Sequence, residues 1–83
     1  MASVTLEAAA SQQLVALPER IKARVVGIIA RLENWPDVSG AKPLRRDLAG
    51  HYRIRTGDYR IQFRVEGEEV IVERMGHRDG FYE

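Results

Sequence analysis

Alternating apolar and charged residues on either side of a Gly-Asp pair constrain this chain more than any other part of its sequence. Residues 51–60 are His-Tyr-Arg-Ile-Arg-Thr-Gly-Asp-Tyr-Arg. A period of two predicts strands with one apolar face and one charged face. A two-residue turn at Gly57-Asp58 would place Arg55 directly opposite Arg60, with Arg53 beside them. Because facing like charges destabilise a strand pair, the pattern favours a surface that binds a polyanion.

The remaining sequence predicts two helices ahead of an antiparallel sheet. Residues 8–17 have apolar side chains at helical spacing, and residues 18–35 carry a stronger amphipathic pattern. Pro18 suits the first turn of the second helix, and Pro36 is expected to end it. Residues 4–6 can form a short first strand. Three further strands are predicted at residues 51–56, 59–66 and 69–75, with a second turn at Gly67-Glu68.

The predicted sheet has an apolar face that would pack on the helices. In the first two main strands the core-facing residues are expected to be Tyr52, Ile54, Tyr59, Ile61, Phe63 and Val65. In the third strand Val70, Ile71 and Val72 are consecutive and Met75 is out of phase, which a β-bulge or burial of both faces would explain. The expected fold class is α+β, with an N-terminal helical pair packed on a C-terminal antiparallel meander in a single domain over residues 1–83.

Charge is segregated along the chain, although the net charge is only +1. Between residues 42 and 64 there are seven basic residues and two acidic ones. The basic residues of this segment are Lys42, Arg45, Arg46, Arg53, Arg55, Arg60 and Arg64. A basic stretch of this kind is typical of a surface that contacts nucleic acid.

Several classes of protein are disfavoured by what the sequence lacks. There is no cysteine, which excludes disulfides and thiolate metal sites and favours a reducing cytoplasm. His51 and His77 without cysteines or paired carboxylates do not make a metal site. No apolar run is long enough for a membrane span, and no phosphate loop, nucleotide fingerprint or Ser-His-Asp pattern is present. We therefore expect a cytoplasmic protein with no cofactor, no metal and no membrane partner.

The second half of the chain resembles the RelE/ParE superfamily of bacterial toxins. The matching residues are 48–55, 57–61, 76–78 and Tyr82, and the preceding helical pair agrees in order and length. The resemblance implies a RelE-like two-layer fold and a toxin of a type II toxin–antitoxin module. It further implies a ribosome-dependent, metal-independent endoribonuclease that cuts messenger RNA in the decoding A site. The implied partners are a cognate antitoxin, the message and the ribosome.

The resemblance also implies roles for particular residues. Catalytic roles are expected for Arg55, Arg60, Arg78 and Tyr82. RNA binding is expected of Arg53 and Arg55; the basic segment adds Lys42, Arg45, Arg46 and Arg64 to this set, and the position next to Arg78 adds His77. In metal-free cleavage the 2′-OH attacks the adjacent phosphate, and arginine forks can clamp its non-bridging oxygens. Tyr82 would stack on a base or accept a proton, and His77 is a supporting candidate for proton donation because arginine stays protonated.

Two other functions compete with the nuclease. The first is a ParE-like inhibitor of DNA gyrase, which would use the same scaffold without a nuclease step. The second is a stand-alone RNA-binding domain that binds in a salt-sensitive manner. The arginine face is also compatible with a solvated strand surface, His77 with an ordinary turn histidine, and Tyr82 with a ring packed on the sheet. The combination of four arginines with Tyr82 favours the nuclease.

Overall fold

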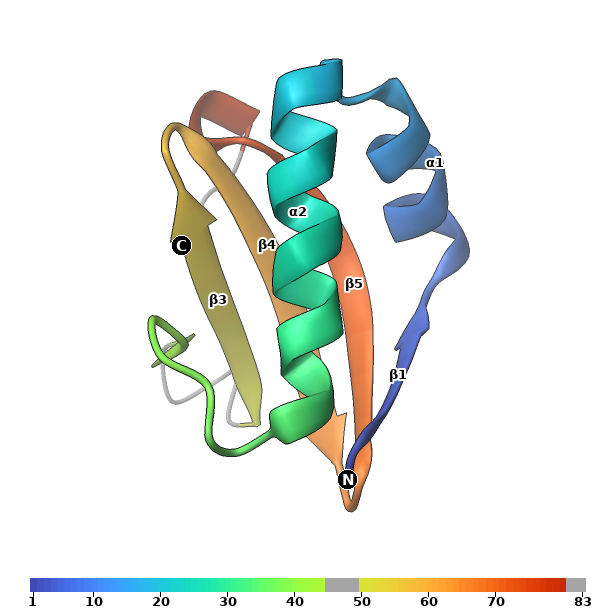
Figure 1. Cartoon of the computed structure of the whole chain (residues 1–83), viewed down its shortest axis with the longest axis vertical. Coiled ribbons are helices and arrows are strands. Elements are labelled where there is room, and N and C mark those ends of the chain that lie inside the picture. Colours follow the sequence, from blue (N-terminus) through green and yellow to red (C-terminus); the bar gives the residue numbers. More distant parts are fainter. Residues whose placement is uncertain (45–49, 81–83) are drawn as a thin grey trace.

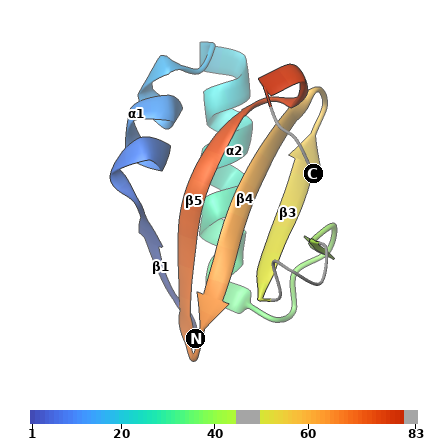
Figure 2. The same cartoon turned by 180° about the vertical axis from the view of Figure 1, so that it is seen from behind.

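Two helices cover one face of a five-stranded sheet in the computed structural model, which describes residues 1–44 and 50–80. Neither helix lies on the opposite face (Figures 1 and 2). The helices are α1 (Ala8–Ala16) and α2 (Glu19–Arg31), and a 3-10 turn, η1 (Leu32–Asn34), continues α2. The strands are β1 (Ser3–Leu6), β2 (Lys42–Pro43), β3 (His51–Thr56), β4 (Tyr59–Glu66) and β5 (Glu69–His77), with a second 3-10 turn, η3 (Arg78–Gly80), after β5.

A proline marks the start of the second helix. The expected break between the helices is confirmed, because Pro18 occupies the N-cap position of α2. The second helix is shorter than the predicted span of residues 18–35, since its α-helical part ends at Arg31. Trp35 has extended backbone angles (φ −50°, ψ 136°), as a residue before a proline prefers. Among the described residues, no helix is long and apolar enough to cross a membrane.

The sheet is mixed, with strand order β1-β5-β4-β3-β2. The three main strands form the expected antiparallel meander, and β5 extends two residues beyond its predicted end. The possible first strand is present as β1. It pairs in parallel with β5, which makes the otherwise antiparallel sheet mixed. Val4 and Leu6 of β1 pack against the core, and this packing holds so short a strand in place. The short strand β2 lies between the second helix and β3, where no strand was predicted.

The hairpin between β3 and β4 has the predicted register. Arg55 faces Arg60, and the two residues of the turn are Gly57 and Asp58. Gly57 has φ +59°, which matches the first central position of a type II′ turn, where glycine is favoured. The twist of such a turn suits the flanking strands, so the turn and the alternation of the strands specify the same pairing.

A β-bulge explains the broken alternation of the third main strand, as the sequence suggested. Gln62 pairs with Arg74 and Phe63 pairs with Val72, so Glu73 is an extra residue on β5. The bulge lets Met75 join Val72 in the core, although two residues, Glu73 and Arg74, lie between them along the strand.

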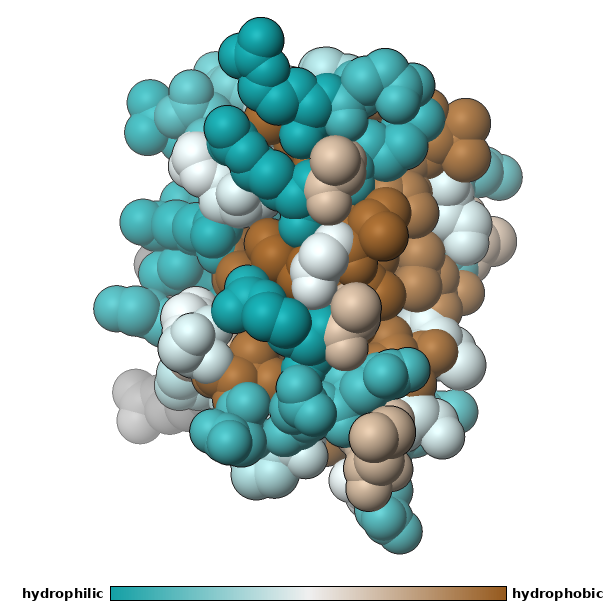
Figure 3. Space-filling view, viewed as in Figure 1, coloured by the Kyte–Doolittle hydropathy of each residue, from teal (hydrophilic) through white to brown (hydrophobic). Residues whose placement is uncertain are grey.

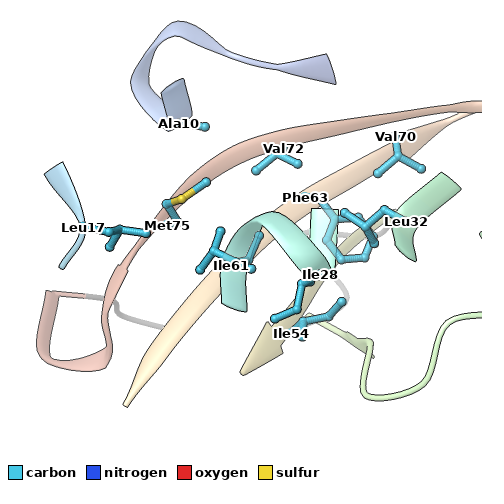
Figure 4. Close-up of a cluster of buried hydrophobic side chains, with 11 residues drawn as sticks. Ala10, Leu17, Ile28, Leu32, Ile54, Ile61, Phe63, Val70, Val72 and Met75 are labelled. Atoms are coloured by element: carbon cyan, nitrogen blue, oxygen red, sulfur yellow. The ribbon is translucent and has the colours of Figure 1, made fainter. Parts of the chain in front are cut away.

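The core lies between α2 and the sheet (Figure 4). Of the residues predicted to face it, Ile54, Ile61 and Phe63 are buried, while Tyr52, Tyr59 and Val65 are partly buried against it. Trp35 closes one end, with its ring centroid 4.7 Å from Tyr52 and 5.4 Å from Phe63 in edge-on contacts. The outer side of the helical layer shows apolar atoms between charged ones (Figure 3), and Val15 and Val26 are 75% and 51% exposed.

Candidate nucleic-acid interface

The open face of the sheet carries basic side chains in two rows that cross the strands. Residues that pair across a sheet share a face, so the register shows which side chains lie together. The row nearest the β3–β4 turn contains Arg55, Arg60 and Gly76. The next row contains Lys42, Arg53, Gln62 and Arg74. Five of these seven residues are cations, and they come from four different strands.

A hollow of about 180 Å³ lies at the turn end of the first row. It is lined by Arg55, Gly57, Asp58, Arg60 and Arg78. The backbone N–H of Arg78 donates to the carbonyl oxygen of Asp58 at 2.7 Å, which fastens the end of β5 beside the turn. The Arg78 side chain is 61% exposed, and its Nε lies 3.9 Å from Oδ1 of Asp58. Two segments remote from each other along the chain, the β3–β4 hairpin and the residue after β5, thus meet at one cationic hollow.

The electrostatics of this hollow disfavour the charge on Arg60. The pKa of Arg60 is lowered first by burial and then by repulsion from Arg55, Arg53 and Arg78. An arginine nevertheless stays protonated near neutral pH. The hollow therefore holds like charges close together, and a phosphate, which accepts forked hydrogen bonds from guanidinium groups, would relieve their repulsion.

Carboxylates gather around Arg64, further along β4. Its guanidinium donates to Glu66 at 2.9 Å, Glu7 at 3.0 Å and Glu73 at 3.1 Å. These hydrogen bonds raise the pKa of Arg64. Arg64 shares the open face with the predicted RNA-binding arginines, but its guanidinium is neutralised by acids from three parts of the chain.

Glu73, the extra residue of the bulge, links this acidic cluster to the second row. Its Oε1 accepts from Gln62 Nε2 at 3.0 Å and lies 2.9 Å from His51 Nδ1. Burial alone would raise the pKa of Glu73, but hydrogen bonds from Gln62, His51 and Arg64 outweigh burial and leave it lowered. Glu73 therefore joins Gln62, His51 and Arg64 on the open face.

Most of the predicted site residues within the described ranges come together, and one does not. Arg55, Arg60 and Arg78 line the hollow, while Arg53 and Lys42 lie in the neighbouring row. His77 pairs with Tyr59 on the helix side of the sheet, and their ring centroids are 5.3 Å apart. The geometry therefore does not bring His77 into the hollow. Arg45, Arg46 and Tyr82, which were also predicted, lie outside the described residues.

Three side chains near the interface were missed by sequence reasoning. Among the described residues that line the hollow, Asp58 is the one that carries a carboxylate. Arg74 reaches the open face because of the bulge, whose position the sequence did not fix. Arg24 of α2 approaches the turn from the helix side, since a Cβ added to Gly57 would lie 3.5 Å from its Nη1. No sequence signal shows that a helix residue lies this close to the turn.

Other hollows and clusters do not fit an anion. A hollow of about 370 Å³ beside Trp35 is lined by Met1, Glu33, Asn34 and Asp37 as well, so two carboxylates face it. A neighbouring hollow of about 360 Å³ includes Glu68. In the described part of the chain, no group of three or more His, Cys, Asp or Glu side chains is arranged to hold a metal ion.

Comparisons with known proteins agree with this architecture. A family model for the ParE toxin of the type II toxin–antitoxin system parDE matches residues 4–80. Toxin RelG of Mycobacterium tuberculosis is 35% identical over 82 residues, covering 96% of this chain and 94% of the relative. Toxin RelE of the same organism is 41% identical over 71 residues, covering 84% of this chain and 72% of that toxin.

Solved structures show the same fold. In the toxin–antitoxin complex RelBE2 of Mycobacterium tuberculosis, one chain is similar with a TM-score of 0.79 and 36% identity over 93% of this chain and 98% of that one. In the RelB-RelE antitoxin–toxin complex of Methanococcus jannaschii, the TM-score is 0.78 with 27% identity over 90% of this chain and 91% of that one. The isolated E. coli RelE toxin, at 17% identity and a TM-score of 0.78 over 93% of this chain and 84% of that one, shares the fold.

Proposed function

This chain belongs to the RelE/ParE superfamily of toxins from type II toxin–antitoxin systems, and on that basis we propose that it is an endoribonuclease that cuts messenger RNA on the ribosome. The relatives RelG and RelE support the RelE branch. The observation that carries the proposal is the hollow lined by Arg55, Arg60 and Arg78. Three guanidinium groups held together in this way fit a phosphodiester, which accepts forked hydrogen bonds from them.

The chemistry follows from these side chains. The 2′-OH of a nucleotide attacks the adjacent phosphorus, the bond to the 5′-oxygen breaks, and a 2′,3′-cyclic phosphate and a 5′-hydroxyl result. Arg60 and Arg78 clamp the non-bridging oxygens and stabilise the extra negative charge of the transition state. Arg55 faces Arg60 across the hairpin and adds to this charge stabilisation. The reaction in this form requires no metal ion.

Proton transfer needs an acceptor for the 2′-OH and a donor for the leaving 5′-oxygen. Tyr82, for which a base or stacking role was predicted, remains a candidate. Asp58 places a carboxylate at the hollow and is a second candidate for the acceptor. Comparison of Asp58→Asn with the wild type tests this role, because an essential acceptor would give a large loss of cleavage rate with little change in RNA binding.

The test of the proposed activity uses purified protein, ribosomes and a programmed message. We expect cleavage within the codon in the A site, and the double variant Arg60→Ala/Arg78→Ala should abolish both cleavage and toxicity. Arg31→Ala is a matched control, since Arg31 is exposed in the last turn of α2, away from the open face. A message that stays intact with the wild-type protein would refute the nuclease.

The name of the matching family model, ParE toxin, favours a second candidate: a gyrase inhibitor with no nuclease step. Under this alternative the arginine hollow would be dispensable. Growth arrest with induction of the DNA-damage response, intact messages and persistent toxicity of Arg60→Ala/Arg78→Ala would identify a gyrase inhibitor.

We further propose that a cognate antitoxin neutralises this toxin, as two of the similar chains are in complexes with antitoxins. The basic open face suggests that the antitoxin places acidic residues opposite residues 53–64, and the exposed Val15 and Val26 offer apolar contact area on the helices. Co-expression with a short open reading frame adjacent to the toxin gene should restore growth. Failure of every adjacent frame to do so would count against this partner.

A further inference from the structure

The second basic row of the open face has no role in the reaction described above. It runs across four strands in the order Lys42, Arg53, Gln62, Arg74. With strands spaced about 4.8 Å apart, the row spans roughly 14 Å, and it lies about 7 Å along the strands from the row of Arg55 and Arg60. It therefore runs parallel to the row of Arg55 and Arg60, two residues further along each strand.

Arg74 is held in this row through a defined set of hydrogen bonds. Its Nε donates to Gln62 Oε1 at 3.2 Å, and Gln62 Nε2 donates to Glu73 Oε1 at 3.0 Å. Both ends of the Gln62 amide are thus engaged, which fixes the orientation of the amide and of the arginine that it binds. This contact joins Nε of Arg74 to a neutral amide oxygen, whereas the guanidinium of Arg64 donates to carboxylates.

The acidic cluster around Arg64 limits the row on one side. Glu7, Glu66 and Glu73 surround Arg64 in the next part of the open face. A nucleic-acid backbone that ran along the strands away from the hollow would meet these carboxylates. A backbone that ran across the strands would meet Arg53 and Arg74 on either side of Gln62. Charge complementarity therefore favours the second path.

We propose that Lys42, Arg53 and Arg74 form a phosphate-binding row that holds the RNA next to the scissile phosphate, with Gln62 as a positioning residue for Arg74. This inference rests on the proposed function for the identity of the RNA and adds a path and two residues to it. The RNA crosses the sheet from β2 to β5, parallel to the row of Arg55 and Arg60.

The experiment measures how the affinity for RNA depends on salt. The probe is a short single-stranded oligoribonucleotide with 2′-O-methyl groups, which cannot be cleaved by 2′-OH attack. Each lost phosphate contact lowers the slope of log K against log salt by about 0.7 for a single strand. We expect Arg74→Gln to lower the slope by that amount and to weaken binding roughly three- to tenfold. Arg31→Gln, which removes the same charge from α2, should leave the slope unchanged.

Two more variants separate a contact from a structural role. Arg74→Lys should restore the slope, because a point charge also displaces a counterion. Gln62→Met keeps both neighbouring charges and removes the hydrogen bonds, so it should lower affinity while leaving the slope as in the wild type. Thermal unfolding of each variant, measured in parallel, identifies any that fail to fold, and Arg53→Gln then provides an independent test of the same row.

The outcomes distinguish this inference from the proposed function. A wild-type slope for both Arg74→Gln and Arg53→Gln would overturn the row, even if the protein cleaves messages. Weakened antitoxin binding with an unchanged RNA slope would also overturn it, because the row would then bind carboxylates of the antitoxin. If the wild type binds RNA with a slope that depends on Arg74 but leaves messages on ribosomes intact, the row stands and the nuclease falls.

Discussion

Replacing Arg60 by methionine should greatly lower the cleavage rate and make the folded protein more stable. Arg60 is half-buried, faces Arg55, and has a pKa lowered by burial and by neighbouring arginines. Arginine is protonated in both the folded and the unfolded chain near neutral pH, so a lowered pKa in the folded state means that folding disfavours this charge. Methionine keeps an unbranched apolar stem of similar reach and removes the charge.

The expected salt dependence of the stability and the expected loss of cleavage rate follow from the geometry of the site. The Cα atoms of facing residues in an antiparallel pair are about 4.5–5.5 Å apart, which is within the Debye length of about 10 Å at 0.1 M salt. At 1 M salt the Debye length falls to about 3 Å, so the gain in stability of Arg60→Met should shrink. Loss of one preorganised charge-stabilising donor should lower the cleavage rate about 100- to 1,000-fold.

Urea denaturation at low and high salt measures the stability, and cleavage of programmed messages on ribosomes measures the activity. Arg60→Lys is the matched variant, because it keeps the charge and loses the planar fork. It should be more active than Arg60→Met, but it should not share the gain in stability over the wild type. Arg31→Met removes an equal charge from the last turn of α2, where a cation is favourable, and should not stabilise. The reasoning is refuted if Arg60→Met unfolds at a lower urea concentration than the wild type or cleaves at the wild-type rate.

Further changes test the surroundings of the interface. Glu73→Gln should lower the free energy of unfolding at neutral pH by about 1–2 kcal/mol. Because the pKa of the folded carboxyl is lowered, the wild type should lose this advantage as pH falls through that pKa. Urea titrations at several pH values measure this, and a difference in unfolding free energy between the two proteins that did not change with pH would contradict it. Arg64→Gln should leave the salt dependence of RNA binding unchanged, since carboxylates already surround the guanidinium; a lower slope would show that it contacts RNA. Phe63→Ala should reduce the free energy of unfolding by about 3–5 kcal/mol in chemical denaturation, and a loss below 1 kcal/mol would mean that the aromatic cluster is not part of the core. Gly57→Ala should destabilise by about 1 kcal/mol because φ is +59° there; equal thermal stability would indicate that the turn can change its conformation at no cost.

The sequence was most informative where local chemistry and pairing agree. A Gly-Asp turn between two alternating segments leaves one register in which the apolar faces coincide, so the opposition of Arg55 and Arg60 could be predicted from the sequence. The break at Pro18 was equally predictable, because a proline is compatible with a first helical turn and not with a helix interior. In both cases a few adjacent residues determine the outcome.

Long-range contacts were beyond reach for a physical reason. The partners of Arg64 include Glu7, which is 57 residues away and reaches it only because β1 pairs with β5. The side on which His77 lies depends on the register of β5, which the bulge shifts at Glu73. A one-residue change in register exchanges the two faces of a strand. The face of any residue after the bulge could therefore be predicted only if the position of the bulge were known, and the sequence pattern did not fix that position.

The extra residue in β5 also makes the chain unequally sensitive to deletions along that strand. Loss of the single codon for Glu73 would remove the bulge and leave Arg74 opposite Gln62 and Met75 opposite Ile61, so the pairing on both sides would be kept. In a regular strand that retained Glu73, by contrast, Met75 would point to water and Arg74 into the hydrocarbon interior, and Arg78 would leave the turn that it adjoins. A deletion at this position should therefore be tolerated better than one in a regularly paired part of β5, and natural homologues should include chains that are one residue shorter at this point.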